Sequence, residues 1–114
     1  MGEKNSAYNM AESRAVSRYI LDNYYSVQFS FNDMGPIYLF KLRNISLSEP
    51  CILVKEDSSV FEQLEVGDIL DMKFNPMELS VPNKLLKTKI ISKHSHDLFT
   101  GHSLVGLSII EEAN

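Results

Sequence analysis

Short segments in which apolar and polar residues alternate, separated by turn-forming residues, constrain this chain more than any other feature. In residues 25–32, valine and phenylalanine alternate with serine and glutamine, the period of a strand with one buried face. Residues 37–45 are rich in aromatic and β-branched side chains and place Lys41 and Arg43 on one face. The segment between them, Asn-Asp-Met-Gly-Pro, is typical of a turn. We therefore predict that the two segments form a hairpin.

The rest of the chain continues this pattern at short spacing. A helical turn capped by Ser58 or Ser59 is expected to run through Phe61 and Leu64. Further strands are expected over residues 51–54, 69–74, 85–95 and 104–111. Six strands, one short helix and no sustained helical periodicity predict a mainly β fold, a small antiparallel β-barrel that is closed or nearly closed.

Length and composition restrict the class of protein. The 114 residues suit one domain, which we place at residues 14–114, after a flexible N-terminal tail at residues 1–13. The chain lacks an apolar run long enough to span a membrane and a signal-peptide core, and its single cysteine, Cys51, lies in an apolar strand segment. These features predict a cytoplasmic protein.

The net charge of −4 argues against binding to DNA or RNA polymers, which requires basic patches. A small anionic ligand needs only local positive charge.

Two short motifs flank the predicted hairpin. Arg14 and Arg18 form an R-x-x-x-R motif before it, and Asn44-Ile45-Ser46-Leu47-Ser48-Glu49 follows it. In this order and strand context the motifs resemble those of the PilZ domain, whose signature is R-x-x-x-R, a β-hairpin and then D/N-x-S-x-x-G. The resemblance covers residues 14–110 and includes a final strand with Val105-Gly106-Leu107. It implies a bacterial receptor that binds cyclic di-GMP and signals to a partner in motility, polysaccharide or biofilm control.

The residue types suit that ligand. Guanidinium groups offer fixed forks of donors to phosphate oxygens or to the O6/N7 edge of guanine. Arg14 and Arg18 can act from an irregular arm, or from one face of a helix because of their i,i+4 spacing. Asn44 supplies an acceptor and a donor for a base edge, and Ser46 supplies a hydroxyl group. The ligand would order the arm and thereby change the conformation of the domain.

Glu49 occupies the last position of the motif, where the family has glycine. Glutamate resists positive φ and adds a carboxylate beside a dianionic ligand, and Pro50 favours an extended conformation at Glu49. We count Glu49 among the site positions and expect it to weaken binding. The alternative is a degenerate PilZ-type adaptor that binds no nucleotide and acts through protein partners.

Each assignment has a simpler structural interpretation. The arginine pair can be a solvated basic junction, and Asn44 and Ser46 can cap local backbone groups. Lys41 and Arg43 are expected on a solvated strand face.

The remaining candidates give weaker signals. His94 and His96 would share a strand face with His102 nearby, but no further ligand completes a metal set. Tyr19, Tyr24 and Tyr25 have rings that can stack on a base, but aromatic residues beside strands usually pack in the core or at its rim, and Tyr19 is the one to test. We predict no metal and, because no catalytic constellation is recognisable, no enzymatic activity.

Overall fold

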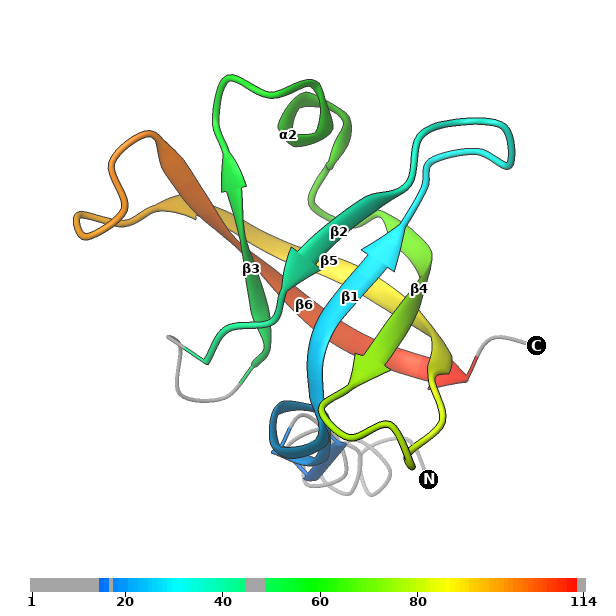
Figure 1. The fold of residues 1–114 in the computed structure, drawn as a ribbon. Helices are drawn as coiled ribbons and strands as arrows, with labels where there is room; N and C mark the ends of the chain where they lie inside the picture. The colour runs from blue at the N-terminus through cyan, green and yellow to red at the C-terminus, as the bar shows by residue number, and fades with distance from the viewer. Residues whose placement is uncertain (1–14, 17, 45–48, 113–114) are drawn as a thin grey trace, which may run out of the picture.

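The computed structural model describes residues 15–16, 18–44 and 49–112, and these residues form a mainly β structure (Figure 1). Nearly all of the predicted elements are present. The strands are β1 (Tyr24–Phe29), β2 (Tyr38–Lys41), β3 (Cys51–Lys55), β4 (Ile69–Pro76), β5 (Lys84–Ser95) and β6 (His102–Glu112).

The six strands form one antiparallel sheet that curls into a nearly closed barrel. Their order is β2-β1-β4-β5-β6-β3, so β2 and β3 lie at the two ends of the sheet. An isolated bridge brings these ends together: the Arg43 N–H donates to the Cys51 carbonyl at 2.8 Å, and the Cys51 N–H donates to the Arg43 carbonyl at 3.1 Å. The predicted antiparallel barrel and the β1–β2 hairpin are confirmed.

One face of each strand fills the barrel. Val27, Ile52, Phe74, Ile90 and Leu107 come from five different strands and are completely buried. Burial of a side chain of this size contributes about 1.5–3 kcal/mol. The alternation that was visible in the sequence therefore marks the side of each strand that faces the core.

A helix precedes β1 and closes one end of the barrel (Figure 1). Residues 15–16 and 18–23 are helical, and we call this segment the N-terminal helix. Val16, Tyr19 and Ile20 have the i,i+3/i+4 spacing of one helix face, and Ile20 is only 2% exposed within the core. The expectation of a single short helix was therefore wrong. A short segment with one apolar face can form a helix when that face packs against the rest of the fold. The predicted tail at residues 1–13 lies outside the described residues.

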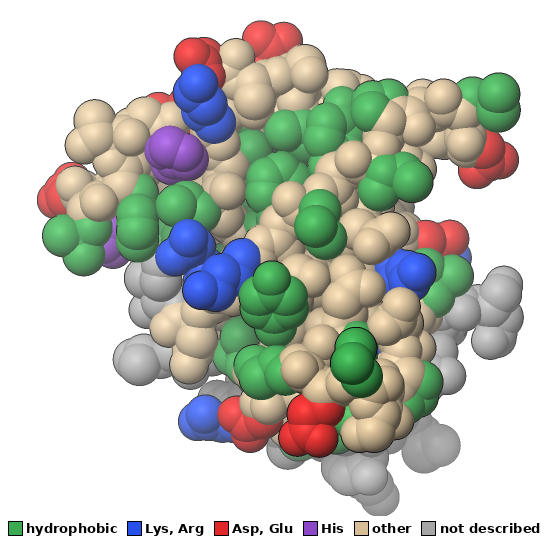
Figure 2. Space-filling view, in the orientation of Figure 1, with side chains coloured by type: hydrophobic (Ala, Val, Ile, Leu, Met, Phe, Trp, Pro, Cys, Tyr) green, Lys and Arg blue, Asp and Glu red, His purple; other side chains and the backbone are tan. Residues whose placement is uncertain are grey.

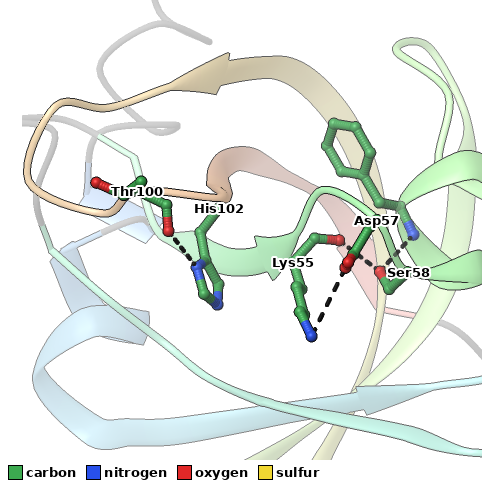
Figure 3. Close-up of polar contacts among 6 residues, drawn as sticks. Lys55, Asp57, Ser58, Thr100 and His102 are labelled. Carbon is green, nitrogen blue, oxygen red and sulfur yellow. Dashed lines mark hydrogen bonds and ion pairs between the residues drawn. The ribbon is translucent and has the colours of Figure 1, made fainter.

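The second helix, α2 (Ser59–Gln63), lies at the opposite end of the barrel and confirms the predicted helical turn. Ser58 is its N-cap: the Ser58 hydroxyl accepts from the Phe61 N–H at 3.3 Å and donates to the Lys55 carbonyl at 2.6 Å (Figure 3). These two bonds fix the direction in which the chain leaves β3 and enters α2.

Candidate functional site

A row of four residues crosses the outer face of the barrel. Arg43 is opposite Cys51, Cys51 is opposite Gly106, and Gly106 is opposite Ser92. Directly opposed residues of a sheet project from the same face. The preceding and following residues of β6 are buried in the core, so the row Arg43–Cys51–Gly106–Ser92 projects outward. We call it the outer row.

A hollow of about 150 Å³ lies on the outer row. Gly106 leaves room for it, because a Cβ atom there would come within 2.5 Å of the Ser92 Oγ. The hollow combines apolar surface with a hydroxyl group, an imidazole and a carboxylate. Its lining residues are Glu49, Cys51, Ile91, Ser92, His94, Leu104 and Gly106.

The Arg43–Cys51 bridge also places the loop that carries the second motif. The bridge joins the chain just before Asn44 to the chain just after Pro50, so both ends of this loop meet at the outer row. Asn44 is exposed and Glu49 is half-buried. Ser46 lies outside the described residues. Glu49 thus lines the hollow, whereas Asn44 directly follows the bridged Arg43 and is not among the lining residues. The ligand contacts of Asn44, Ser46 and Glu49 all stay predictions.

The arginine motif is only partly described. Arg14 lies outside the described residues, and Arg18 lies on the N-terminal helix with its side chain 70% exposed. The Arg18 guanidinium is 4.0 Å from the carboxylate of Asp22, one helical turn further on. Within the described residues no hydrogen bond or ion pair links Arg18 to Asn44. Of the two geometries that the spacing allowed, Arg18 therefore has the helical one and is open to solvent.

The N-terminal helix and the motif loop nevertheless depart from the same end of the β1–β2 hairpin. Two residues after the helix ends, the Tyr25 carbonyl accepts from the Leu42 N–H at 2.8 Å. Leu42 directly precedes the bridged Arg43, and Asn44 follows. Arg18 and Asn44 are therefore both close along the chain to the backbone hydrogen bond between Tyr25 and Leu42.

Arg43 is packed more closely than its position in the sequence pattern predicts. It was expected on a solvated strand face, but its side chain is half-buried, and its guanidinium carbon lies 5.7 Å from the centre of the Phe99 ring. A cation over an aromatic face is attracted by the ring quadrupole. Arg43 lies in the outer row because of its bridge to Cys51, which joins the two ends of the sheet. No local sequence pattern predicts this bridge. Ser92 and His94 were missed as hollow residues because the register between β5 and β6 shifts between Ile90 and Ser92, and alternation along the chain does not reveal this shift.

Tyr19, the tyrosine proposed to stack on a base, lies beside a second pocket. Its ring is 47% exposed and makes an edge contact with the Tyr24 ring at 6.2 Å. The Lys84 ammonium lies 5.8 Å from the centre of the Tyr19 ring. This pocket, of about 390 Å³, is mostly apolar and separate from the outer row; it is lined by Ala15, Val16, Tyr19, Ile20, Lys84, Leu86, Ile109 and Ile110.

The histidines of the β5–β6 hairpin have ordinary contacts. The His96 ring packs against the Phe99 ring at 5.5 Å, and the His102 Nδ1 lies 3.2 Å from the Thr100 carbonyl (Figure 3). Within the described part of the chain, no three His, Cys, Asp or Glu side chains are grouped so that they could hold a metal ion.

A carboxylate ties this hairpin to the end of β3. The Glu56 Oε2 accepts from the Ser95 Oγ at 2.8 Å and from the Ser103 Oγ at 2.6 Å. The hydrogen bond from Ser103, followed by that from Ser95, lowers the pKa of Glu56 below its ordinary value of 4.5. His102 lowers this pKa further through its charge.

Comparisons with protein families, with curated proteins and with solved structures found no match to this chain. Neither helix in the described residues has the length and apolar character of a membrane span.

Proposed function

We propose that this chain is a receptor domain of the PilZ type for cyclic di-GMP, and that the hollow on the outer row receives part of the ligand. The observation that carries the proposal is the convergence of the motif loop and the outer row at the Arg43–Cys51 bridge. A binding site commonly combines apolar surface with a few polar groups in a concave region, and this is the composition of the hollow.

The size of the hollow limits what it holds. Small-molecule pockets commonly measure about 300–1,000 Å³, and this hollow measures about 150 Å³. We infer that one planar base enters it over Ile91 and Leu104, with the Ser92 hydroxyl and the Asn44 amide available to the base edges. The remainder of the dinucleotide would lie along the outside of the barrel.

We infer that three arginines would supply the positive charge that the phosphates need: Arg14 and Arg18 of the first motif, and Arg43. Arg14 lies outside the described residues. Arg43 lies in the outer row, and Arg18 projects into solvent from the N-terminal helix. A bound dianion would draw the Arg18 guanidinium away from Asp22, whose distance of 4.0 Å and high exposure indicate a weak ion pair. Movement of the N-terminal helix would then report binding. The readout would be a change in conformation.

Glu49 favours the second candidate function, an adaptor that binds no nucleotide. It lines the hollow itself, where its carboxylate would repel a phosphate or occupy the place of a ligand acceptor group. In this case the barrel would act only through protein contacts.

Isothermal calorimetry with cyclic di-GMP at modest salt distinguishes the two functions. We expect saturable binding by the natural chain, loss of binding in Arg14→Ala and Arg18→Ala, and unchanged binding in Lys73→Ala, which removes an exposed cation from β4. Absence of both heat and a thermal shift at high ligand concentration would overturn the receptor function and leave the adaptor.

A further inference from the structure

The barrel has an open seam between β2 and β3. β2 pairs with β1, β3 pairs with β6, and among the described residues the Arg43–Cys51 bridge is the single backbone pairing across the seam. From that bridge the two strands diverge toward α2 (Figure 1). Each strand therefore presents one edge that the sheet does not use.

The register shows which backbone groups point into the seam. The Leu42 N–H donates to the Tyr25 carbonyl, and because antiparallel bonding alternates along a strand, Phe40 and Tyr38 also bond to β1. The N–H and C=O groups of Leu39 and Lys41 must then point away from β1. They point to the same side as the backbone N–H and C=O of Arg43, which bond to Cys51 of β3. An unpaired edge of this kind is a template for an added strand.

Apolar side chains line the seam between these edges. Tyr38, Phe40 and Phe61 are partly buried and pack against the core. Figure 2 shows hydrophobic side chains gathered above its centre, in the region between β2, β3 and α2 of Figure 1. Leu39 is 63% exposed on β2 itself. A strand added here would cover apolar surface as well as backbone groups.

Charge restricts the kind of strand that fits. Lys41 is exposed on β2, which carries no acidic residue, and Arg43 follows it. On the other side of the seam Lys55 is compensated by Asp57, at 3.7 Å (Figure 3). The charge that β2 itself carries is therefore positive, and it favours an acidic partner.

We propose that the β2 edge binds an extended segment of a partner protein in which acidic and apolar residues alternate. Leu39 and Lys41 would form the backbone bonds, with apolar residues of the segment on the aromatic side chains and acidic residues near Lys41. A second copy of this chain fits less well, because two antiparallel β2 edges would bring both Lys41 residues onto one face of a short ribbon. The proposal goes beyond nucleotide binding and does not depend on it.

The test uses the full chain without cyclic di-GMP and a capped peptide of three glutamates alternating with three valines. Titration followed by ¹⁵N NMR should show saturable shifts and slowed hydrogen exchange at the Leu39 and Lys41 amides. A peptide N-methylated at alternate residues, so that its donors toward β2 are removed, should bind at least about tenfold more weakly.

Variants of the β2 edge separate backbone pairing from general attraction. Leu39→Pro removes an outward N–H without removing a bond to β1, so it should abolish binding, whereas Leu39→Ala should retain binding. Lys41→Glu should weaken binding, and Lys73→Glu on β4 should not.

Three results would overturn the proposal: no saturable shift, shifts confined to other strands, or equal binding of the N-methylated peptide. Concentration-dependent dimerisation through the Leu39 and Lys41 amides, measured without peptide, would also overturn it and identify a second copy as the occupant. Because nucleotide is absent throughout, failure here leaves the receptor function standing.

Discussion

The ammonium group of Lys93 lies 2.6 Å from the Leu64 carbonyl oxygen, just beyond the last residue of α2. It also donates to the Phe61 carbonyl at 2.9 Å and lies 4.0 Å from the centre of the Phe61 ring. Carbonyl groups at a helix C-terminus lack intrahelical partners and carry partial negative charge. Lys93 therefore fastens α2 to β5 by closing the end of this short helix.

We predict that Lys93→Met, which keeps the apolar stem of the side chain, lowers the free energy of unfolding by about 1.5–3 kcal/mol, the usual contribution of a hydrogen bond to a charged group. Urea denaturation measures the change. Lys89→Met, an exposed position on the same strand, is the matched control and should change stability little. Equal effects of the two substitutions would contradict the role given to the Lys93 ammonium.

The hydrogen bonds that Glu56 accepts from Ser95 and Ser103 make stability depend on pH. Since the pKa of Glu56 is lower in the folded chain than its ordinary value of 4.5, the ionised group stabilises the fold fully above that value. The contribution is lost as pH falls through the lowered pKa. Glu56→Gln should therefore destabilise the protein at pH 7, by an amount that shrinks as pH falls below about 4.5.

Thermal unfolding of the natural chain and Glu56→Gln between pH 3 and pH 7 checks this sign. Glu78→Gln removes an exposed carboxylate from the turn after β4 and serves as the control. A stability difference that grows toward low pH would contradict the assignment.

Gly106 keeps the hollow open, because a Cβ atom at this position would lie 2.5 Å from the Ser92 Oγ and force one of the two groups to move. We expect Gly106→Ala to destabilise the barrel by about 1–3 kcal/mol through overpacking. Adding Ser92→Ala should restore most of that loss, because it removes the Oγ that the new methyl group meets. A double-mutant cycle by urea denaturation measures the coupling, and strictly additive effects would show that the two residues do not compete for space.

Substitutions of Glu49 test whether this residue, which stands where the PilZ motif has glycine, weakens binding of cyclic di-GMP. Glu49→Gly should strengthen binding of cyclic di-GMP, because it removes a carboxylate from the hollow and restores backbone freedom. Glu49→Gln removes only the charge and should give part of the gain. Calorimetry on both variants separates the two causes, and unchanged or weaker binding by Glu49→Gly would show that our physical account of this residue is wrong.

The strands were predictable because alternation and turn residues are local signals. Residues 85–95 were expected as a strand and β5 is Lys84–Ser95. The strand expected over residues 37–45 is shorter, Tyr38–Lys41, with Arg43 in an isolated bridge, since an edge strand has one neighbour and stops where pairing stops. The N-terminal helix was not predicted, because Ile20 is buried by tertiary contacts that no local window contains.

The candidate site was predictable only in part. Of the positions named from the motif, Glu49 lines the hollow and Asn44 directly follows the bridged Arg43, and their contacts with a ligand stay predictions. The hollow depends on cross-strand neighbours such as Gly106 and Ser92. The strands that carry these two residues were predicted, but the register shift between Ile90 and Ser92 that makes them neighbours was not, because alternation along the chain does not reveal it.

The most direct test of the central claim is a ¹⁵N NMR titration of the full chain with cyclic di-GMP that maps the binding surface. We predict saturable shifts at the amides of Asn44, Ser92 and Gly106, together with changes in the N-terminal helix around Arg18. Saturable binding with shifts confined to other surfaces, or no shift at any of these amides at millimolar ligand, would contradict a nucleotide site on the outer row.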